Sequence, residues 1–141
     1  MEEIENIEQR EQVRRFVREG LGCGCPEEVF DQIQVGVEPE VIKGVGSIVR
    51  LVIGSRLLIY VMYPGETSAS LSSVELVVAR GVLDRDVSSF NRVRVVCCLP
   101  SGKGLDNLHA QLNLWVSTDE KAHLHLMKNS KIPLFISRLL A

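Results

Sequence analysis

The chain has 141 residues, a net charge of −2, 45% hydrophobic residues and 24% charged residues, which are ordinary totals for one globular domain. A charge this close to zero gives no support to nucleic-acid binding. A membrane-spanning helix needs about 20 consecutive apolar residues, and Arg50 and Arg56 interrupt the most apolar stretch, so we expect no membrane partner either.

Residues 1–33 are predicted to be helical. Val13, Phe16 and Val17 recur at helical spacing, which indicates an amphipathic helix over residues 5–20. The first residues are rich in glutamate and do not form a basic segment followed by an apolar one, so a secretory signal is not indicated. We therefore expect a cytoplasmic protein whose four cysteines are reduced.

A second, short helix is expected to begin at Pro26, because proline followed by two glutamates is a common helix start. This places Cys25 near the helix N-cap. Residues 34–46 are predicted to contain a short edge strand and a loop, since Gly36 and Pro39 interrupt the apolar pattern.

The stretch 47–63 predicts a central β-hairpin. Two runs of aliphatic and β-branched residues flank Gly54-Ser55, the composition of a two-residue primed turn. That turn would pair Ile53 with Arg56 and make both faces of the sheet apolar. Both faces then need cover, either from the chain's own helices or from a second subunit, and for this reason we expect a homo-oligomer.

Five elements are predicted after the hairpin. They are a helix from residue 67 or 68 to about 83, a strand at 92–99, a helix at 105–116, a strand at 122–127, and an apolar C-terminal tail at 128–141. The expected fold is a single α+β domain over residues 1–141, with a four- or five-stranded mixed sheet centred on the hairpin and two helices ahead of it. Residues 34–127 would supply the sheet and its covering helices.

Cys23-Gly24-Cys25 is the most suggestive chemical motif. A thiolate is the form of cysteine that binds metals and attacks disulfides, and a helix N-terminus lowers a thiol pKa. Glu27 and Glu28 work against thiolate formation because they are negatively charged. The segment resembles the start of small two-iron ferredoxin-like modules, but the later C-x-x-C pair of that family is absent, so the resemblance assigns no ligands.

Zinc or an iron–sulfur cluster usually needs four ligands. His123 and His125 are two residues apart on a predicted strand and therefore share a face, so they could complete a site with Cys23 and Cys25. Two copies of the Cys-Gly-Cys segment in a dimer are an alternative. The pattern favours a histidine pair that is exposed or satisfied by neighbours over a pair of metal ligands.

Two further motifs have simpler interpretations. Cys97-Cys98 lies inside an apolar strand, where adjacent side chains point to opposite faces, so both are expected to be core residues. Ser101, Gly102, Lys103 and Gly104 link a strand to a helix and could hold an anion or a nucleotide phosphate, although a plain turn is the favoured interpretation.

Three functions follow as hypotheses. The first is a metal or redox role for the thiolates of Cys23 and Cys25, with zinc or an iron–sulfur cluster as the possible cofactor. The second is a non-enzymatic, homo-oligomeric interaction domain. The third is anion or nucleotide binding at residues 100–104. The sequence identifies neither a small-molecule substrate nor a catalytic residue, since it lacks a nucleophile elbow of the form G-x-S-x-G.

Overall fold

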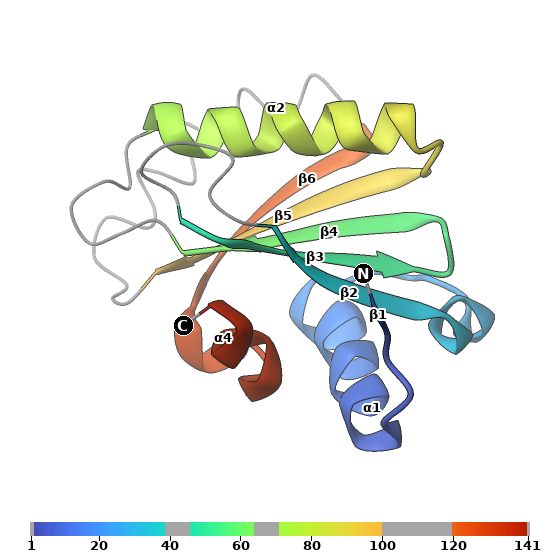
Figure 1. The fold of residues 1–141 in the computed structure, drawn as a ribbon. Coiled ribbons are helices and arrows are strands. Elements are labelled where there is room, and N and C mark those ends of the chain that lie inside the picture. Colours follow the sequence, from blue (N-terminus) through green and yellow to red (C-terminus); the bar gives the residue numbers. More distant parts are fainter. Residues whose placement is uncertain (1, 39–45, 64–70, 100–119, 141) are drawn as a thin grey trace.

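The computed structural model describes residues 2–38, 46–63, 71–99 and 120–140. Within them, one six-stranded sheet lies between two layers of helices (Figure 1). Its strands follow the order of the chain: β1 (Glu2–Glu3), β2 (Ile33–Glu38), β3 (Ile48–Ile53), β4 (Leu57–Met62), β5 (Arg92–Leu99) and β6 (Ala122–Lys128). The first four strands are antiparallel, whereas β5 runs parallel to both β4 and β6.

Helices cover both faces of the sheet. On one face lie α1 (Ile7–Arg15), which continues as a π-helical turn at Phe16–Gly20, and α4 (Leu134–Leu140); α2 (Leu71–Val87) covers the other face (Figure 1). Short 3₁₀ segments occupy Glu27–Asp31 and Asn129–Lys131. No helix in the described ranges is long and apolar enough to cross a membrane.

The prediction of an α+β fold with a mixed sheet is confirmed, and the hairpin provides its two central strands. The predicted number of strands was too low, because β1 is only two glutamates long and has no strand-like pattern. The second N-terminal helix is a 3₁₀ segment of five residues rather than an α-helix. The helix predicted at 105–116 lies outside the described residues.

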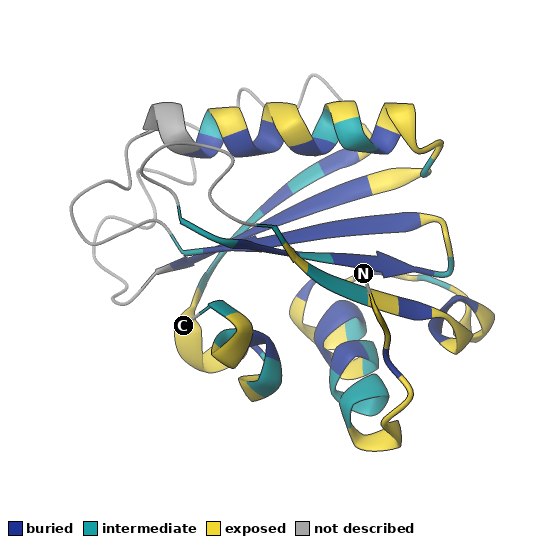
Figure 2. Ribbon diagram, viewed as in Figure 1, coloured by how far each residue is buried: buried dark blue, intermediate teal, exposed yellow. Residues whose placement is uncertain are grey.

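Alternating side chains divide the core into two clusters, one on each face of the sheet. The central strands between the helix layers are largely buried (Figure 2). Val49, Leu51 and Ile53 face α1 and α4, whereas Ile48 and Val52 face α2. The chain's own helices therefore bury both faces of β3 and β4. We expected an oligomer because both faces of the sheet need cover, and the chain's own helices supply that cover. Oligomerisation itself stays a prediction.

The hairpin register differs by one residue from the predicted one. Ile53 pairs with Leu57 rather than with Arg56. Gly54 and Ser55 both have positive φ, and Arg56 N donates to Ile53 O at 3.1 Å, so the turn forms as predicted but Arg56 is left as an extra residue. In the predicted register Arg56 would share the face of Ile53, which is fully buried, and the extra residue keeps its charge exposed.

A polar network fastens α2 to the sheet. The Arg50 guanidinium donates to both carboxylate oxygens of Asp84, at 2.7 and 2.9 Å, and the Tyr60 hydroxyl donates to Asp84 as well. Burial alone would raise the pKa of Asp84, but the hydrogen bonds from Arg50 and Tyr60 outweigh it and lower that pKa. Burial and the Asp84 carboxylate together raise the pKa of Tyr60, which keeps its hydroxyl a donor.

The C-terminal segment lies against the body of the molecule, through α4. Ile136 is fully buried in the cluster below β3, and the Tyr63 hydroxyl donates to Ser137 Oγ at 3.1 Å.

Candidate functional site

Cys23 and Cys25 lie in a short loop between the π-helical turn and the 3₁₀ segment. Backbone bonds fix the start of the loop: Leu21 N donates to Phe16 O at 3.0 Å, and Cys23 N donates to Val17 O at 3.1 Å. Gly22 has a φ of +68°, the left-handed conformation that glycine adopts most easily, and this reverses the chain just before the first cysteine.

Two arginines hold the loop from either side. Arg18 Nη2 donates to Cys25 O at 2.7 Å, and Arg94 Nη1 donates to Leu21 O at 3.1 Å. The Arg18 guanidinium also lies 5.5 Å from the ring centre of Phe30. The loop is therefore tied to the π-helical turn, to the 3₁₀ segment and to β5 by contacts that do not involve either sulfur.

The two sulfur atoms are joined as a disulfide. The expectation that all four cysteines would be reduced therefore holds only for Cys97 and Cys98, which are free. Cys23 is 8% exposed, whereas Cys25 is partly exposed. Cys25 is therefore the more exposed residue of the pair.

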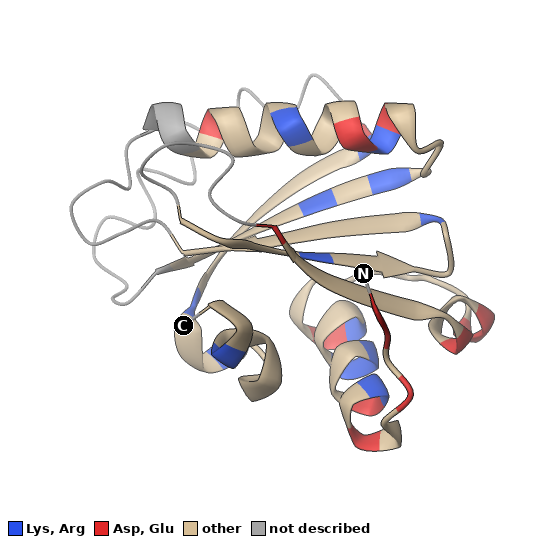
Figure 3. Cartoon of the chain, viewed as in Figure 1, with Lys and Arg blue, Asp and Glu red and all other residues tan. Residues whose placement is uncertain are grey.

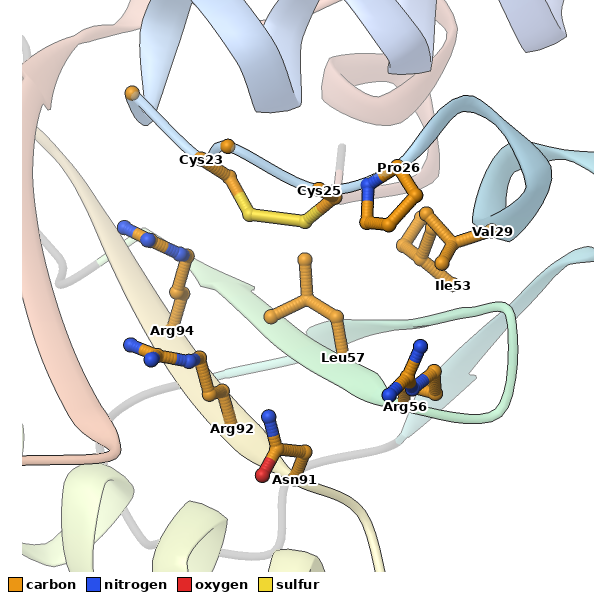
Figure 4. Close-up of a pocket in the computed structure, with 12 residues that line it drawn as sticks. Cys23, Cys25, Pro26, Val29, Ile53, Arg56, Leu57, Asn91, Arg92 and Arg94 are labelled. Atoms are coloured by element: carbon orange, nitrogen blue, oxygen red, sulfur yellow. A yellow bond between two sulfur atoms is a disulfide. The ribbon is translucent and has the colours of Figure 1, made fainter.

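A pocket of about 490 Å³ lies directly beside the disulfide (Figure 4). Its lining includes both cysteines, Leu57, which points toward the disulfide, and the guanidinium groups of Arg56, Arg92 and Arg94. Within the described ranges, no aspartate or glutamate is among the residues that line it. The pocket therefore carries three formal positive charges and no negative one.

Arg94 is the most unusual of these side chains. It is only 8% exposed, and its Nε atom has no hydrogen-bond partner among the residues that the structure describes. Within the described residues its guanidinium contacts a carbonyl and an imidazole, but no carboxylate. Burial, and secondarily the neighbouring charge of Arg92, lowers the pKa of Arg94. A buried cation without an anionic partner destabilises the folded state. Buried charges of this kind, with a shifted pKa, are often found at functional sites.

The strand pattern explains how two of the arginines reach the site. Arg92 and Arg94, the two blue positions of β5 in Figure 3, alternate with Val93 and Val95 along the strand. Both side chains therefore point to the face that carries the cysteine loop (Figure 4). Arg56 is the extra residue of the hairpin, and its carbonyl accepts bonds from Asn91 N and Arg92 N at 2.8 and 3.2 Å. The hairpin end is thereby held against the start of β5.

The histidines predicted as metal ligands lie on the same side of the sheet, next to these arginines. Arg92 Nη1 is 3.3 Å from His123 Nε2, and Arg94 Nη1 is 2.9 Å from His125 Nε2. Since an arginine only donates, the imidazole nitrogens accept in these pairs. Among the described residues, no three histidine, cysteine or acidic side chains come together as a possible metal site, so the predicted set of four is not assembled in this structure.

The electrostatic surroundings of the cysteines differ from the predicted ones. Cys25 precedes Pro26, the N-cap residue of a 3₁₀ segment of only five residues, so a helix dipole contributes little there. Glu27 lies 3.4 Å from Arg14 and 3.3 Å from Arg18, which offset its negative charge. Positive charge from the arginines therefore dominates near the sulfurs.

The other predicted motifs are not part of this site. Cys97 and Cys98 point to opposite faces of β5, as predicted, and burial raises the pKa of each thiol to about 12. Residues 101–104, the predicted anion-binding loop of Ser101, Gly102, Lys103 and Gly104, lie outside the described part of the chain. Our sequence reasoning did not identify the three arginines, although two arginines spaced two apart in an apolar strand are a usable signal.

In comparisons with protein-family models, curated proteins and solved structures, nothing matched this chain.

Proposed function

We propose that the protein is a thiol–disulfide redox protein in which Cys23 and Cys25 cycle between a disulfide and a dithiol. One observation carries the proposal: the disulfide forms part of the wall of a cationic pocket. Nearby arginines favour a thiolate over a thiol, and the thiolate is the reactive form of cysteine. Cys97 and Cys98 have the opposite properties, since they are buried and their thiol pKa values are raised.

The exchange proceeds in two steps. A thiolate of the reducing partner attacks the Cys25 sulfur, the bond to Cys23 breaks, and Cys23 leaves as a thiolate. A second partner thiolate then attacks the partner sulfur of the mixed disulfide and releases the Cys25 thiolate. Two electrons thus pass from two partner thiols to the cysteine pair, and the partner becomes a disulfide.

Attack at Cys25 is favoured because Cys25 is the more exposed of the two cysteines. The departing Cys23 thiolate lies in the wall of the pocket that Arg94 also lines. The Arg94 guanidinium donates a hydrogen bond to the carbonyl of Leu21, two residues before Cys23. A buried positive charge at this position stabilises the developing negative charge of the leaving group.

The test is an equilibrium titration in mixtures of oxidised and reduced dithiothreitol, quenched with acid and analysed by alkylation and mass spectrometry. We expect the fraction of disulfide to follow the ratio of the buffer reversibly while the circular dichroism spectrum stays that of the folded protein. A Cys23→Ser/Cys25→Ser variant is the control and should show no response. A pair that stays in one state across all ratios would refute the proposal.

Zinc or iron–sulfur binding by the reduced pair stays a prediction. The positive lining of the pocket disfavours a bound cation. Elemental analysis of protein purified and reduced without air tests it, and metal at one equivalent that is lost in the Cys23→Ser/Cys25→Ser variant would favour the metal role over the redox role.

A second candidate function, self-association, is supported by the outer surface of α2. Leu76, Leu83 and Val87 are 56%, 63% and 77% exposed and recur at helical spacing. Sedimentation of the wild type and of a Leu76→Glu/Leu83→Glu variant tests it, because a monomer in both cases would contradict self-association through this helix.

A further inference from the structure

The pocket beside the disulfide has a composition that selects among reducing partners. At about 490 Å³, it has the size of a small-molecule site. Arg56, Arg92 and Arg94 contribute planar guanidinium groups, which bind carboxylates through paired hydrogen bonds. Resting on the redox role proposed above, we infer that the preferred substrates are small thiols, or their disulfides, that carry carboxylate groups.

The positive charge of the pocket lining favours anionic substrates. Among the residues that the structure describes, three arginines line the pocket and no aspartate or glutamate does. Within the described residues, neither Arg92 nor Arg94 forms a salt bridge, and their nearest polar partners are His123 and His125. An anion that enters the pocket therefore meets positive charge that no carboxylate of the described protein has already neutralised.

Arg94 is buried, and its hydrogen-bonding capacity is only partly used by the described residues. In the described part of the chain, its Nε atom lacks a hydrogen-bond partner although the residue is only 8% exposed. A carboxylate bound at this guanidinium would offset the cost of burying the charge. Because Arg94 lines the same pocket as both cysteines, a carboxylate held there keeps the attached thiol close to the disulfide.

The exposed arginines complete the site from the pocket rim. Arg92 and Arg56 are exposed, whereas Arg94 is buried. We assign to Arg94 the inner carboxylate contact and to Arg92 and Arg56 the contacts with a second carboxylate. A dicarboxylic thiol should therefore react faster than a monocarboxylic one.

The test compares reduction rates of the oxidised, folded protein by four small thiols of different charge. They are cysteamine, 2-mercaptoethanol, 3-mercaptopropionate and mercaptosuccinate. Each rate constant is divided by the fraction of the thiol that is present as thiolate at the pH of the assay. For each thiol, the rate constant of the wild type is then divided by that of Arg92→Gln or Arg56→Gln, so that the intrinsic reactivity of the thiol cancels. Arg138→Gln is the matched control, since Arg138 is an exposed arginine of α4 that does not line the pocket.

We expect each pocket variant to lower the rate with mercaptosuccinate about tenfold, the loss typical of one charge-assisted hydrogen bond. The rate with 2-mercaptoethanol should stay unchanged, the rate with cysteamine should rise, and Arg138→Gln should behave as the wild type. Added potassium chloride should reduce the advantage of mercaptosuccinate.

Two outcomes separate this inference from the redox role. If all four thiols reduce the disulfide and the variants change every rate by the same factor, charge selection is refuted and the redox role stands. If no thiol, including dithiothreitol, reduces the disulfide in the folded protein, the redox role is refuted and the inference falls with it.

Discussion

Reduction of the disulfide should cost the folded protein little stability. Cys23 and Cys25 are two positions apart, so the bond closes a loop of only three residues. In the chain-entropy treatment, a loop of this length stabilises the folded state by about 1.6 kcal/mol. A domain of this size is typically stable by about 5–15 kcal/mol. The reduced protein should therefore remain folded, as a reversible redox couple requires.

Urea unfolding followed by circular dichroism measures this difference directly. The oxidised and reduced proteins should differ by about 1–2 kcal/mol in the free energy of unfolding, with the same dependence on urea concentration. The Cys23→Ser/Cys25→Ser variant, measured with and without reductant, should not change. A reduced protein that is unfolded in the absence of urea, or a loss above about 4 kcal/mol, would refute the reasoning, because the bond would then be a structural constraint.

Three further predictions concern the fold around the site. Gly54→Ala should destabilise the protein by about 2–3 kcal/mol in chemical denaturation, because φ is +58° and the new Cβ would lie 2.7 Å from Val29 Cβ. Gly24→Ala, with nothing within 4 Å, is its control, and equal losses would contradict the account. Asp84→Asn should cost about 2 kcal/mol at neutral pH. The pKa of Asp84 is lowered in the folded protein, so the stability that its carboxylate contributes is fully present above the unfolded pKa of about 3.9. This stability is lost as the pH falls through the folded pKa, and wild type and variant should therefore converge in acid. A difference that does not shrink as the pH falls below about 3.9 would contradict this assignment. Iodoacetamide should label Cys23 and Cys25 of the reduced, folded protein and spare Cys97 and Cys98, whereas equal labelling of all four would contradict their burial.

Much of the sheet could be predicted from apolar patterning. The strand at Arg92–Leu99 has the predicted bounds, and the hairpin lies at the centre of the sheet as expected. The register of the hairpin could not be read from Gly54-Ser55 alone, since the turn composition is the same with and without an extra residue. Burial of Leu57 and exposure of Arg56 decide the register, and both depend on the neighbouring elements.

The candidate site was only half predicted. The Cys-Gly-Cys motif is visible in the sequence, but its arginine neighbours come from the hairpin end and from β5, segments far apart in the chain. A pocket formed by long-range contacts leaves no local spacing pattern. The unpredicted disulfide has a different cause, because the expected compartment, rather than any residue, argued for reduced cysteines.

In the proposed function, the cysteine pair changes redox state while the rest of the fold stays unchanged. Amide NMR spectra of one ¹⁵N-labelled sample, recorded before and after reduction, test it most directly. We predict that chemical-shift changes are confined to the Cys23 loop, the hairpin end and the start of β5, and that oxidation restores the first spectrum. A spectrum that collapses on reduction, or one that does not respond to any reductant, would contradict the claim.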